Sequence, residues 1–379
     1  MYLLDFINQH PNTWRDELRQ PPFSLKIAEE GDYFLFKYDM LSSDMALELV
    51  QEARGAIVKW DYVEEQYKVV SYPFKKFFNY NESNAAEIDW KTARVWQKID
   101  GSCIQVWYDD GWHFSTLGTI DAFKAVAAES ISFGDLVVAA IGSLRELTDN
   151  LTPDYTYVFE VTSPSNQIVI NYGEKPKLWY LGCRNLISEQ EEQWIPVLPQ
   201  CVQTPKYFPY INNLSILQRL AKTMGNNEEG YVVVDRNWNR VKVKGEEYLR
   251  LHRLRGNGPL TIRRIIEMIM NETVDDYVAA FPAREPQCAE VKNCLAQLVI
   301  DCDSNFNSTM RLMKSRRDFA LAAKKLPGII SGYLFAKLDG KVECGSDYVR
   351  GLTIKKLTEY CKNKLNVKEI EVEVEEEYS

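Results

Sequence analysis

The chain has 379 residues, 45% of them hydrophobic, which is enough for two modest cores, so we expect two domains. No apolar run reaches the ~18 residues that span a bilayer, and residues 1–20 do not resemble a signal peptide, so we expect a cytoplasmic protein without a membrane partner. The net charge is −9, but the acidic tail from Lys368 to Ser379 holds six Glu and one Lys, so the charge does not exclude a nucleic-acid partner.

The first two thirds of the chain alternate strand-like runs with turn signals and a few helices. Such a mixture predicts an α+β fold with largely antiparallel sheets. Asp109-Asp110-Gly111 lies between two strand-like runs and predicts a hairpin turn. Helical spacing occurs at Leu3–Asn8, Thr13–Leu18, Leu136–Leu147 and Leu214–Met224. Strand-like runs occur at Tyr33–Tyr38, Ala56–Trp60, Tyr67–Ser71, Val95–Ile99, Cys103–Tyr108, His113–Leu117, Tyr155–Val161, Lys177–Cys183, Tyr231–Asp235 and Arg240–Lys244.

After about Leu251 the pattern becomes helical, and Gly256-Asn257-Gly258-Pro259 is a plausible boundary. We therefore expect a sheet-containing domain at residues 1–254 and an all-α domain with an acidic tail at residues 255–379. The expected helices are Leu260–Met270, Val274–Phe281, Ala289–Asp301, Met310–Lys325 and Leu352–Leu365.

One lysine stands near the end of a strand-like run and before a tight turn, in Gln97-Lys98-Ile99-Asp100-Gly101-Ser102. A lysine amine attacks phosphorus only in its neutral form, which neighbouring cations or removal from water favour. Gly101 would let the backbone approach a nucleotide closely. K-x-D-G alone is a weak signal, because it arises by chance in roughly one chain in ten of this size. An ordinary lysine before a hairpin turn is the alternative.

A second segment, Arg240-Val241-Lys242-Val243-Lys244, alternates cations with valine. In a strand the three cations share one face about 7 Å apart, as in a phosphate clamp, and they would favour the neutral form of a nearby lysine. A half-exposed strand with a solvated basic face is the alternative.

Two glutamates occur in strand or turn contexts. Glu160 ends the run Tyr157-Val158-Phe159-Glu160, and Glu229 precedes Gly230 and an apolar run. Carboxylates beside a phosphate site hold a divalent cation or a ribose hydroxyl, and Mg²⁺ is the natural cation because it bridges phosphates and carboxylates. The alternative is a pair of surface glutamates at strand edges.

In order, these segments resemble the motifs of the covalent nucleotidyltransferases, the superfamily of ligases and capping enzymes. Three further segments narrow the resemblance to the phage RNA ligase 1 family, which repairs broken tRNA anticodon loops. The resemblance covers about residues 1–250. The helical remainder resembles that family's extra domain and shows no strands of an OB-fold barrel. The motif segments are Lys98–Gly101, Phe159-Glu160, Lys177–Arg184, Glu229-Gly230 and Lys242–Lys244, and the narrowing segments are Ala53–Gly55, Lys76–Asn79 and Ser163–Val169.

The resemblance implies roles residue by residue. Lys98 attacks the α-phosphorus of ATP, and Lys242 and Lys244 contact the α-phosphate. Glu160 reads the ribose, and Glu229 assists metal binding. The other implied nucleotide contacts are Tyr38, Arg54, Lys76 and Gly101, and the implied acidic pair for metal binding is Asp275 and Asp276. For that pair, carboxylates at a helix N-terminus favoured by the helix dipole are the alternative.

One position departs from the family pattern. The family can carry a lysine that contacts the triphosphate just before a glycine after motif I. This chain has Leu117 there, in Phe114-Ser115-Thr116-Leu117-Gly118, and Lys124 is one substitute to consider.

The resemblance implies an RNA ligase that uses ATP and Mg²⁺, or Mn²⁺ in its place. Its expected partner is single-stranded RNA or a nicked tRNA anticodon loop, with single-stranded DNA as another acceptor, and we expect a monomer in the host cytoplasm if the chain is phage-encoded. The alternatives are a DNA ligase, a capping-type nucleotidyltransferase, and a non-catalytic RNA-binding protein on the same fold. Candidate RNA-binding residues are Arg250, His252, Arg253, Arg255, Arg311, Lys314, Arg316, Arg317, Lys324 and Lys325.

Overall fold

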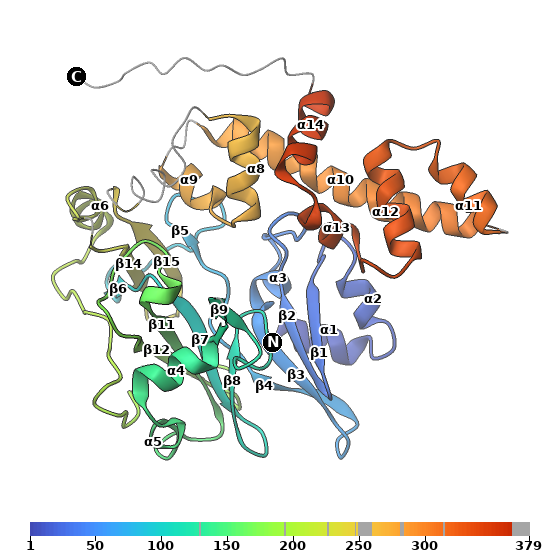
Figure 1. The fold of residues 1–379 in the computed structure, drawn as a ribbon. Coiled ribbons are helices and arrows are strands. Elements are labelled where there is room, and N and C mark those ends of the chain that lie inside the picture. Colours follow the sequence, from blue (N-terminus) through green and yellow to red (C-terminus); the bar gives the residue numbers. More distant parts are fainter. Residues whose placement is uncertain are drawn as a thin grey trace, which may run out of the picture. The chain divides into compact units, whose positions relative to one another are not determined.

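The computed structural model describes residues 1–128, 130–192, 195–225, 227–246, 248, 260–280, 284–313 and 315–365. Contacts divide the chain (Figure 1) into an α+β unit, Met1–Tyr38 with Ser43–Leu254, and a helical unit, Asp39–Ser42 with Arg255–Ser379. The boundary expected at residues 256–259 and the acidic tail lie outside the described residues, so the domain division drawn from the sequence stays a prediction. None of the described helices combines the length and apolar character of a membrane span.

The α+β unit begins with an antiparallel sheet of order β1-β2-β3-β4. Side chains alternate between the two faces of a strand, so Phe34 and Phe36 of β2 both face the core under the N-terminal helices. On the first of these helices, Leu3 and Ile7 lie one turn apart and are fully buried in the same core. The elements are α1 (Tyr2–Gln9), α2 (Trp14–Leu18), β1 (Lys26–Glu30), β2 (Tyr33–Lys37), α3 (Glu48–Glu52), β3 (Arg54–Asp61) and β4 (Gln66–Ser71).

A five-stranded sheet of order β13-β12-β11-β7-β8 forms the middle of this unit. The predicted hairpin at Asp109–Gly111 joins β7 to β8 and is confirmed by their antiparallel pairing. The helix expected over Leu136–Leu147 is two helices, because Gly142 ends the first at φ +79° and Ser143 caps the second. The elements are β7 (Ser102–Tyr108), β8 (Trp112–Thr116), β9 (Val126–Ala128), β10 (Ile131–Ser132), α4 (Phe133–Ile141), α5 (Leu144–Thr148), β11 (Tyr155–Thr162), a 3₁₀ turn (Pro164–Asn166), β12 (Lys177–Asn185) and β13 (Glu191–Glu192).

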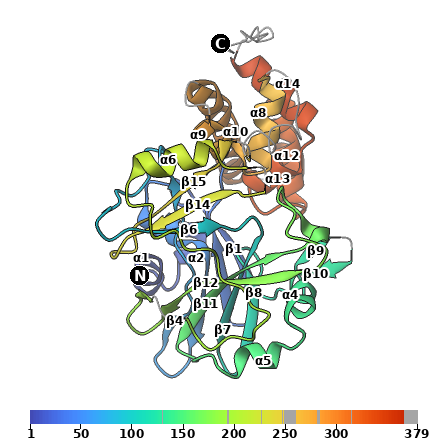
Figure 2. The same ribbon diagram turned by 90° about the vertical axis from the view of Figure 1, so that its left-hand side faces the viewer.

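The third sheet has the order β5-β15-β14-β6. One of its faces carries Val95, Tyr231, Val233, Val241 and Val243, which pack against helix α6 beside β15 (Figure 2). This core fixes the register, because a slip by one residue would turn the apolar side chains away from the helix. The elements are β5 (Phe78–Asn79), β6 (Arg94–Lys98), α6 (Leu214–Lys222), β14 (Gly230–Val234) and β15 (Arg240–Lys244).

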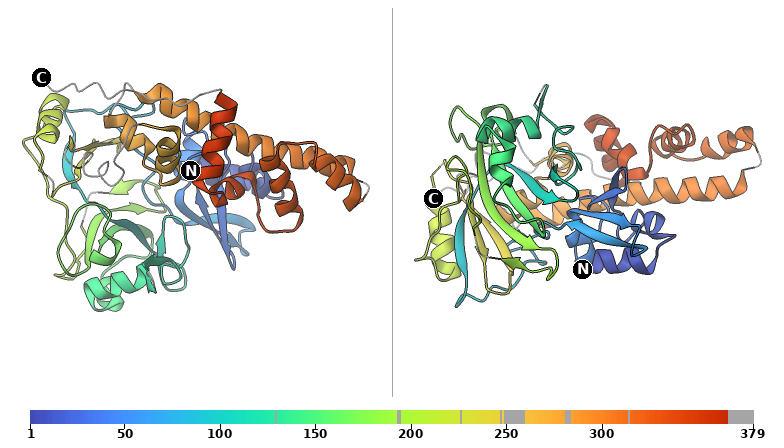
Figure 3. Two further views of the ribbon diagram at one scale, coloured as in Figure 1. Left: turned by 45° about the horizontal axis from the view of Figure 1, so that its top comes forward. Right: turned by 90° about the horizontal axis from the view of Figure 1, so that it is seen from below.

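The helical unit packs its helices around one apolar core. Its 28-residue helix α10 is the long orange helix of Figure 3. The short segment Asp39–Ser42 also belongs to this unit, where Asp39 accepts hydrogen bonds from Ser346 and Arg350 of α13. The elements are α8 (Ile262–Met270), α9 (Val274–Ala280), α10 (Glu285–Leu312), α11 (Arg316–Ala323), α12 (Gly328–Leu338), α13 (Gly345–Gly351) and α14 (Ile354–Leu365).

The predicted α+β class with a helical C-terminal region is confirmed, and each of the ten strand-like runs corresponds to an observed strand. The helix expected over Met310–Lys325 is wrong as a single helix, because Met313 is extended and Ser315 caps a new one. Helices α12 and α13 were not anticipated.

Candidate active site

Strand pairing places the predicted cations of the third sheet in rows on the face opposite the α6 core. Strand β14 lies between β6 and β15 and is antiparallel to both. Gly230 pairs with Lys98 on one side and with Lys244 on the other, so these two lysines flank a residue without a side chain. The next two rows along the same face are Trp96, Val232 and Lys242, and then Arg94, Val234 and Arg240. The shared face predicted for the cations of β15 is confirmed.

Glu229 joins the two lysines. Its carboxylate accepts a hydrogen bond from Nζ of Lys98 at 2.8 Å and forms an ion pair with Nζ of Lys244 at 3.0 Å, using a different oxygen for each. Burial opposes ionisation of Glu229, but the two lysines outweigh it, and the pKa of Glu229 lies below its usual value. Glu229 is only 2% exposed. The nucleophile expected from the sequence is therefore held against a buried carboxylate rather than directly against cations.

Gly230 is required for this arrangement. Its φ is +154°, and a Cβ at this position would collide with the carbonyl oxygen of Val243 on β15. A larger residue would push β15 away and separate Lys98 from Lys244. The glycine after Glu229 thus serves the close approach of two strands.

The turn after Lys98 is anchored by Asp100, which is 5% exposed. Its carboxylate accepts hydrogen bonds from the backbone N–H groups of Val169 and Ile170 at 2.8 Å and from the Tyr248 hydroxyl at 2.9 Å. The aspartate of K-x-D-G therefore holds the segment after β11 against the end of β6. The two backbone N–H groups bind Oδ2 of Asp100 and the Tyr248 hydroxyl binds Oδ1. Because both carboxylate oxygens are held, the direction in which the turn leaves β6 is fixed.

Gly101 also makes a contact that was not predicted, while its expected approach to a nucleotide stays a prediction. A Cβ there would lie 2.5 Å from the carbonyl oxygen of Val161 and 2.9 Å from Cγ of Glu160. The close approach that requires a glycine is made by the backbone of β11. This contact also brings the turn after Lys98 against Glu160.

Glu160 lies on β11, where its neighbour in β7 is Cys103. The pKa of Glu160 is raised to about 7, chiefly by burial and also by the charge of Glu229, while Lys98 and Arg54 act in the opposite direction. A carboxyl group with a pKa near neutrality beside a lysine is typical of functional sites.

A cavity of about 340 Å³ opens beside these residues, within the ~300–1,000 Å³ range of small-molecule sites. Lys98, Gly101 and Glu160 line it, as do Trp96 and Val232 of the second row. An aromatic ring and a branched aliphatic side chain next to a charged group suit a ligand with an aromatic base and a phosphate. The cavity residues of the second sheet include Cys103, Tyr180, Gly182, Cys183 and Glu191.

The other predicted nucleotide contacts lie near this cavity to different extents. Arg54 lines it, and its guanidinium donates a hydrogen bond to the carbonyl of Phe74 at 3.2 Å. Lys76 lies over the rings of Tyr38 and Phe78, with Nζ 5.3 and 5.5 Å from the ring centroids. Among the described residues, Tyr38 and Lys76 are not part of the cavity lining, so their contact with a nucleotide stays a prediction.

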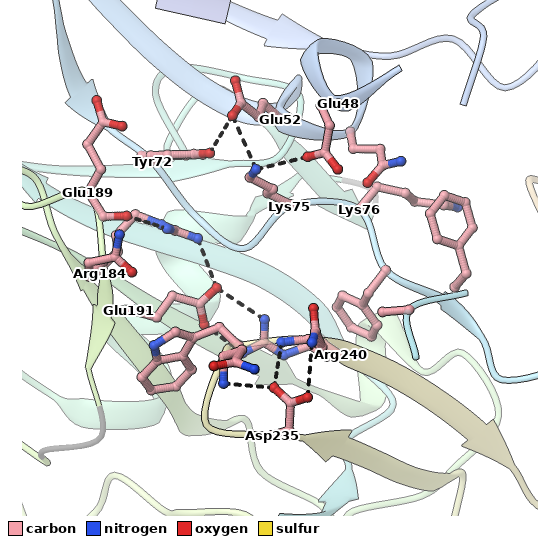
Figure 4. Close-up of a pocket in the computed structure, with 18 of the residues that line it drawn as sticks. Glu48, Glu52, Tyr72, Lys75, Lys76, Arg184, Glu189, Glu191, Asp235 and Arg240 are labelled. Carbon is pink, nitrogen blue, oxygen red and sulfur yellow. Dashed lines mark hydrogen bonds and ion pairs between the residues drawn. The ribbon is translucent and has the colours of Figure 1, made fainter. Parts of the chain in front are cut away.

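Arg240 is engaged in a buried network that was not predicted from the sequence. Glu191 accepts hydrogen bonds from Arg184 at 2.8 Å and from Arg240 at 2.7 Å (Figure 4), and its side chain is 5% exposed. Each guanidinium also lies 4.1 Å from the centroid of an aromatic ring, Tyr72 for Arg184 and Phe74 for Arg240. This network separates the 340 Å³ cavity from a second, polar cavity of about 940 Å³. Arg240 is therefore bound to a carboxylate that it shares with Arg184. The predicted phosphate clamp of Arg240, Lys242 and Lys244 stays a prediction.

Asp275 and Asp276 lie in the first turn of α9 in the helical unit. Asp275 is 3.6 Å from Nζ of Lys292 on α10. Within the described part of the chain, no three His, Cys, Asp or Glu side chains form a cluster that could hold a metal ion. The metal-binding role expected for Glu229, Asp275 and Asp276 stays a prediction.

The candidate RNA contacts at residues 250–255 and at Lys314 lie outside the described residues. Arg316 is paired with Asp339 at 2.6 Å.

Comparison with known proteins places the chain in a family. A family model described as RNA ligase matches residues 52–249, just over half of the chain. A protein of Autographa californica nuclear polyhedrosis virus, described as a bifunctional polynucleotide kinase/RNA ligase, is 31% identical over 285 residues, which cover 69% of this chain and 39% of that protein. This chain therefore spans about two fifths of that relative. An RNA ligase of Rhodothermus phage RM378 is 24% identical over 90% of this chain and 93% of its own length.

Solved structures resemble the chain only distantly. An archaeal ATP-dependent RNA ligase matches 68% of this chain and 64% of its own, with 11% identity and a TM-score of 0.36. At so low a score this likeness carries no weight in the assignment. The family model and the phage relative confirm the resemblance drawn from the motifs. The chain belongs to the RNA ligase family.

Proposed function

We propose that the chain joins 5′-phosphate and 3′-hydroxyl ends of single-stranded RNA with ATP, through an AMP group carried on Lys98. The observation that carries this proposal is the row formed by Lys98, Gly230 and Lys244 with the buried carboxylate of Glu229. Lys98 of this row lines a cavity of suitable size for a nucleoside.

In the first step, Nζ of Lys98 attacks the α-phosphorus of ATP and pyrophosphate leaves. In its ion pair with Glu229, Nζ of Lys98 has to lose one proton to solvent and leave the carboxylate before its lone pair can attack phosphorus. Lys242 and Lys244, one row apart on β15, neutralise the charge that builds on the α-phosphate oxygens. Catalysis in such a transfer is chiefly alignment and charge neutralisation, which a strand register supplies.

Other residues of the α+β unit position the nucleotide. Glu160 accepts a hydrogen bond from a ribose hydroxyl, and Trp96 and Val232 flank the base. Arg54, Lys76 and Tyr38 contact the nucleotide outside the α-phosphate.

A divalent cation, Mg²⁺ or Mn²⁺, would bridge phosphate oxygens and lower the charge repulsion at the reacting phosphorus. Carboxylates are ligands that such an ion prefers, and Glu229 and Glu160 both lie close to Lys98. Glu229 would hold the ion together with the phosphates. Asp275 and Asp276 are a separate proposed metal-binding pair within the helical unit.

In the later steps, AMP moves from Lys98 to the RNA 5′-phosphate, and the 3′-hydroxyl then displaces AMP. A nicked tRNA anticodon loop is the proposed acceptor, with single-stranded DNA as a weaker one, and the enzyme acts as a monomer in the host cytoplasm.

The test is incubation with ATP labelled at the α-phosphate and a 5′-phosphorylated oligonucleotide. Wild-type protein is expected to carry the label and to circularise the RNA. Lys98→Ala and Lys98→Arg should carry none, because guanidinium stays protonated at working pH. Lys91→Ala, a change at an exposed lysine three residues before β6 begins at Arg94, is the matched control. Labelling that persists in Lys98→Ala contradicts the proposal, and a preference for DNA ends or GTP favours a DNA ligase or a capping enzyme. Absence of label in the wild type favours a non-catalytic RNA-binding protein.

A further inference from the structure

The terminal phosphates of ATP need positive charge. Lys98, Lys242 and Lys244 do not supply it, because these lysines face the α-phosphate in the proposed function. Pyrophosphate leaves with several negative charges, and cations at the point of departure favour both its binding and its release from phosphorus. This inference rests on the proposed function and concerns which residue provides that charge.

The cavity wall has an apolar residue where the family can carry a lysine. Leu117 lines the cavity, and its chain neighbour Gly118 is exposed. The turn that contains them is firmly built, because the Thr116 hydroxyl accepts hydrogen bonds from the N–H groups of Gly118 at 3.1 Å and Thr119 at 3.0 Å. A leucine cannot bind phosphate, so this wall of the cavity provides no charge of its own.

A lysine from another strand lies beside this turn. The stem of Lys37 passes over Gly118, with Cδ 3.6 Å and Nζ 3.9 Å from the position that a Cβ of Gly118 would occupy. Lys37 ends β2, where its partner across the ladder is Arg54 of β3, which lines the cavity. Lys37 is thus paired with the cavity residue Arg54 and lies beside the turn that carries the cavity residue Leu117, although Lys37 itself does not line the cavity.

Lys124, the substitute considered from the sequence, is engaged elsewhere. Its amine pairs with Glu30 of β1 and lies 3.8 Å from Asp121, and its side chain is 63% exposed. Two carboxylates already neutralise this lysine, which makes it a suitable control.

We propose that Lys37 contacts the β- and γ-phosphates of ATP and takes the place of the lysine that is absent at position 117. Because Gly118 has no side chain, the Lys37 stem lies across the turn beside Leu117. In this proposal the amine approaches the terminal phosphates from β2 instead of from the end of β8. Lys37 acts only while the triphosphate is present, so it contributes to the adenylylation of Lys98 and not to the transfer of AMP between nucleic acids.

The test separates these steps with two substrates. Lys37→Met keeps the length of the stem over Gly118 and removes the charge. With ATP, the KM for enzyme adenylylation should rise about 10- to 100-fold, the effect of one charge-assisted hydrogen bond. With RNA that is already adenylylated at its 5′ end, and no ATP, sealing by Lys37→Met should equal that of the wild type, which also shows that the variant is folded.

Two further variants sharpen the result. Lys124→Met should leave the KM for ATP unchanged. Adding Leu117→Lys to Lys37→Met should restore much of the lost ATP affinity, because it places a cation on this wall of the cavity. The inference is overturned if Lys37→Met leaves the KM for ATP unchanged. It is also overturned if Lys37→Met weakens sealing of pre-adenylylated RNA as much as it weakens adenylylation with ATP. A wild type that seals neither substrate instead refutes the proposed function.

Discussion

Gly101 of K-x-D-G offers a sharp test of how the site is built. The sequence suggests that this glycine admits a nucleotide, and the structure shows that it also admits the backbone of β11. In Gly101→Ala, the new Cβ would lie 2.5 Å from the carbonyl oxygen of Val161 and 2.9 Å from Cγ of Glu160. Both atoms belong to a central strand of the five-stranded sheet, so neither can move alone.

The magnitude follows from this geometry. An ordinary contact requires a shift of roughly half an ångström or more between the turn and β11, and overpacking of this kind costs about 1–3 kcal/mol. We expect the free energy of unfolding of Gly101→Ala to fall by about 2–3 kcal/mol. A displacement of about 1 Å can lower a rate about 100-fold, so adenylylation of Lys98 should fall at least tenfold.

Urea denaturation and labelling with ATP measure the two effects. Gly225→Ala is the matched control, because a Cβ at Gly225 meets no atom within 4 Å, and its free energy of unfolding should stay within about 0.5 kcal/mol of the wild type. If Gly101→Ala unfolds like the wild type but no longer binds ATP, the glycine serves the nucleotide and our reasoning about β11 is wrong.

Two other predictions concern buried carboxylates. Burial raises the pKa of Glu160 from about 4.5 to about 7, so the wild type loses stability as pH rises through this range. Glu160→Gln never ionises. Its free energy of unfolding should rise by about 1–3 kcal/mol relative to that of the wild type between pH 4.5 and 7, and the difference should persist above pH 7. A gain that does not vary with pH in urea titrations at pH 4.5 and 8 would contradict this. Glu191→Ala leaves two buried guanidinium groups uncompensated and should lower the free energy of unfolding by about 3–5 kcal/mol. The control is Glu48→Ala, at a 56% exposed side chain, which should change the free energy of unfolding by less than about 1 kcal/mol. Equal losses in the two variants would argue against the network.

Local patterns predicted the strands well, because alternation of side chains is a property of the segment itself. The shared face of β15 followed from the alternate positions of Arg240, Lys242 and Lys244 alone. The helix breaks at Gly142 and Ser315 were harder, since apolar spacing continues across both, and only the cap geometry marks the end of each helix.

Contacts between distant segments could not be predicted in the same way. Nothing in the sequence around Glu191 indicates that two arginines from other strands share its carboxylate, and nothing near Lys37 indicates that its amine lies beside Gly118. Both depend on how sheets pack on each other, which side-chain alternation within one strand does not determine. The same limit explains why the contact of Gly101 with β11 was not predicted.

The order of the motifs along the chain was informative because it corresponds to a strand register. Lys98 and Glu229 are 131 residues apart in sequence, yet β14 lies between β6 and β15 and brings both lysines to one carboxylate. A one-residue slip of β14 would turn Tyr231 and Val233 away from the α6 core and would move Gly230 out of its row with Lys98 and Lys244. Burial of these side chains against α6 resists the slip. The apolar residues between the charged ones therefore help to hold Lys98, Lys244 and Glu229 in place, and the proposed site depends on the sheet as a whole.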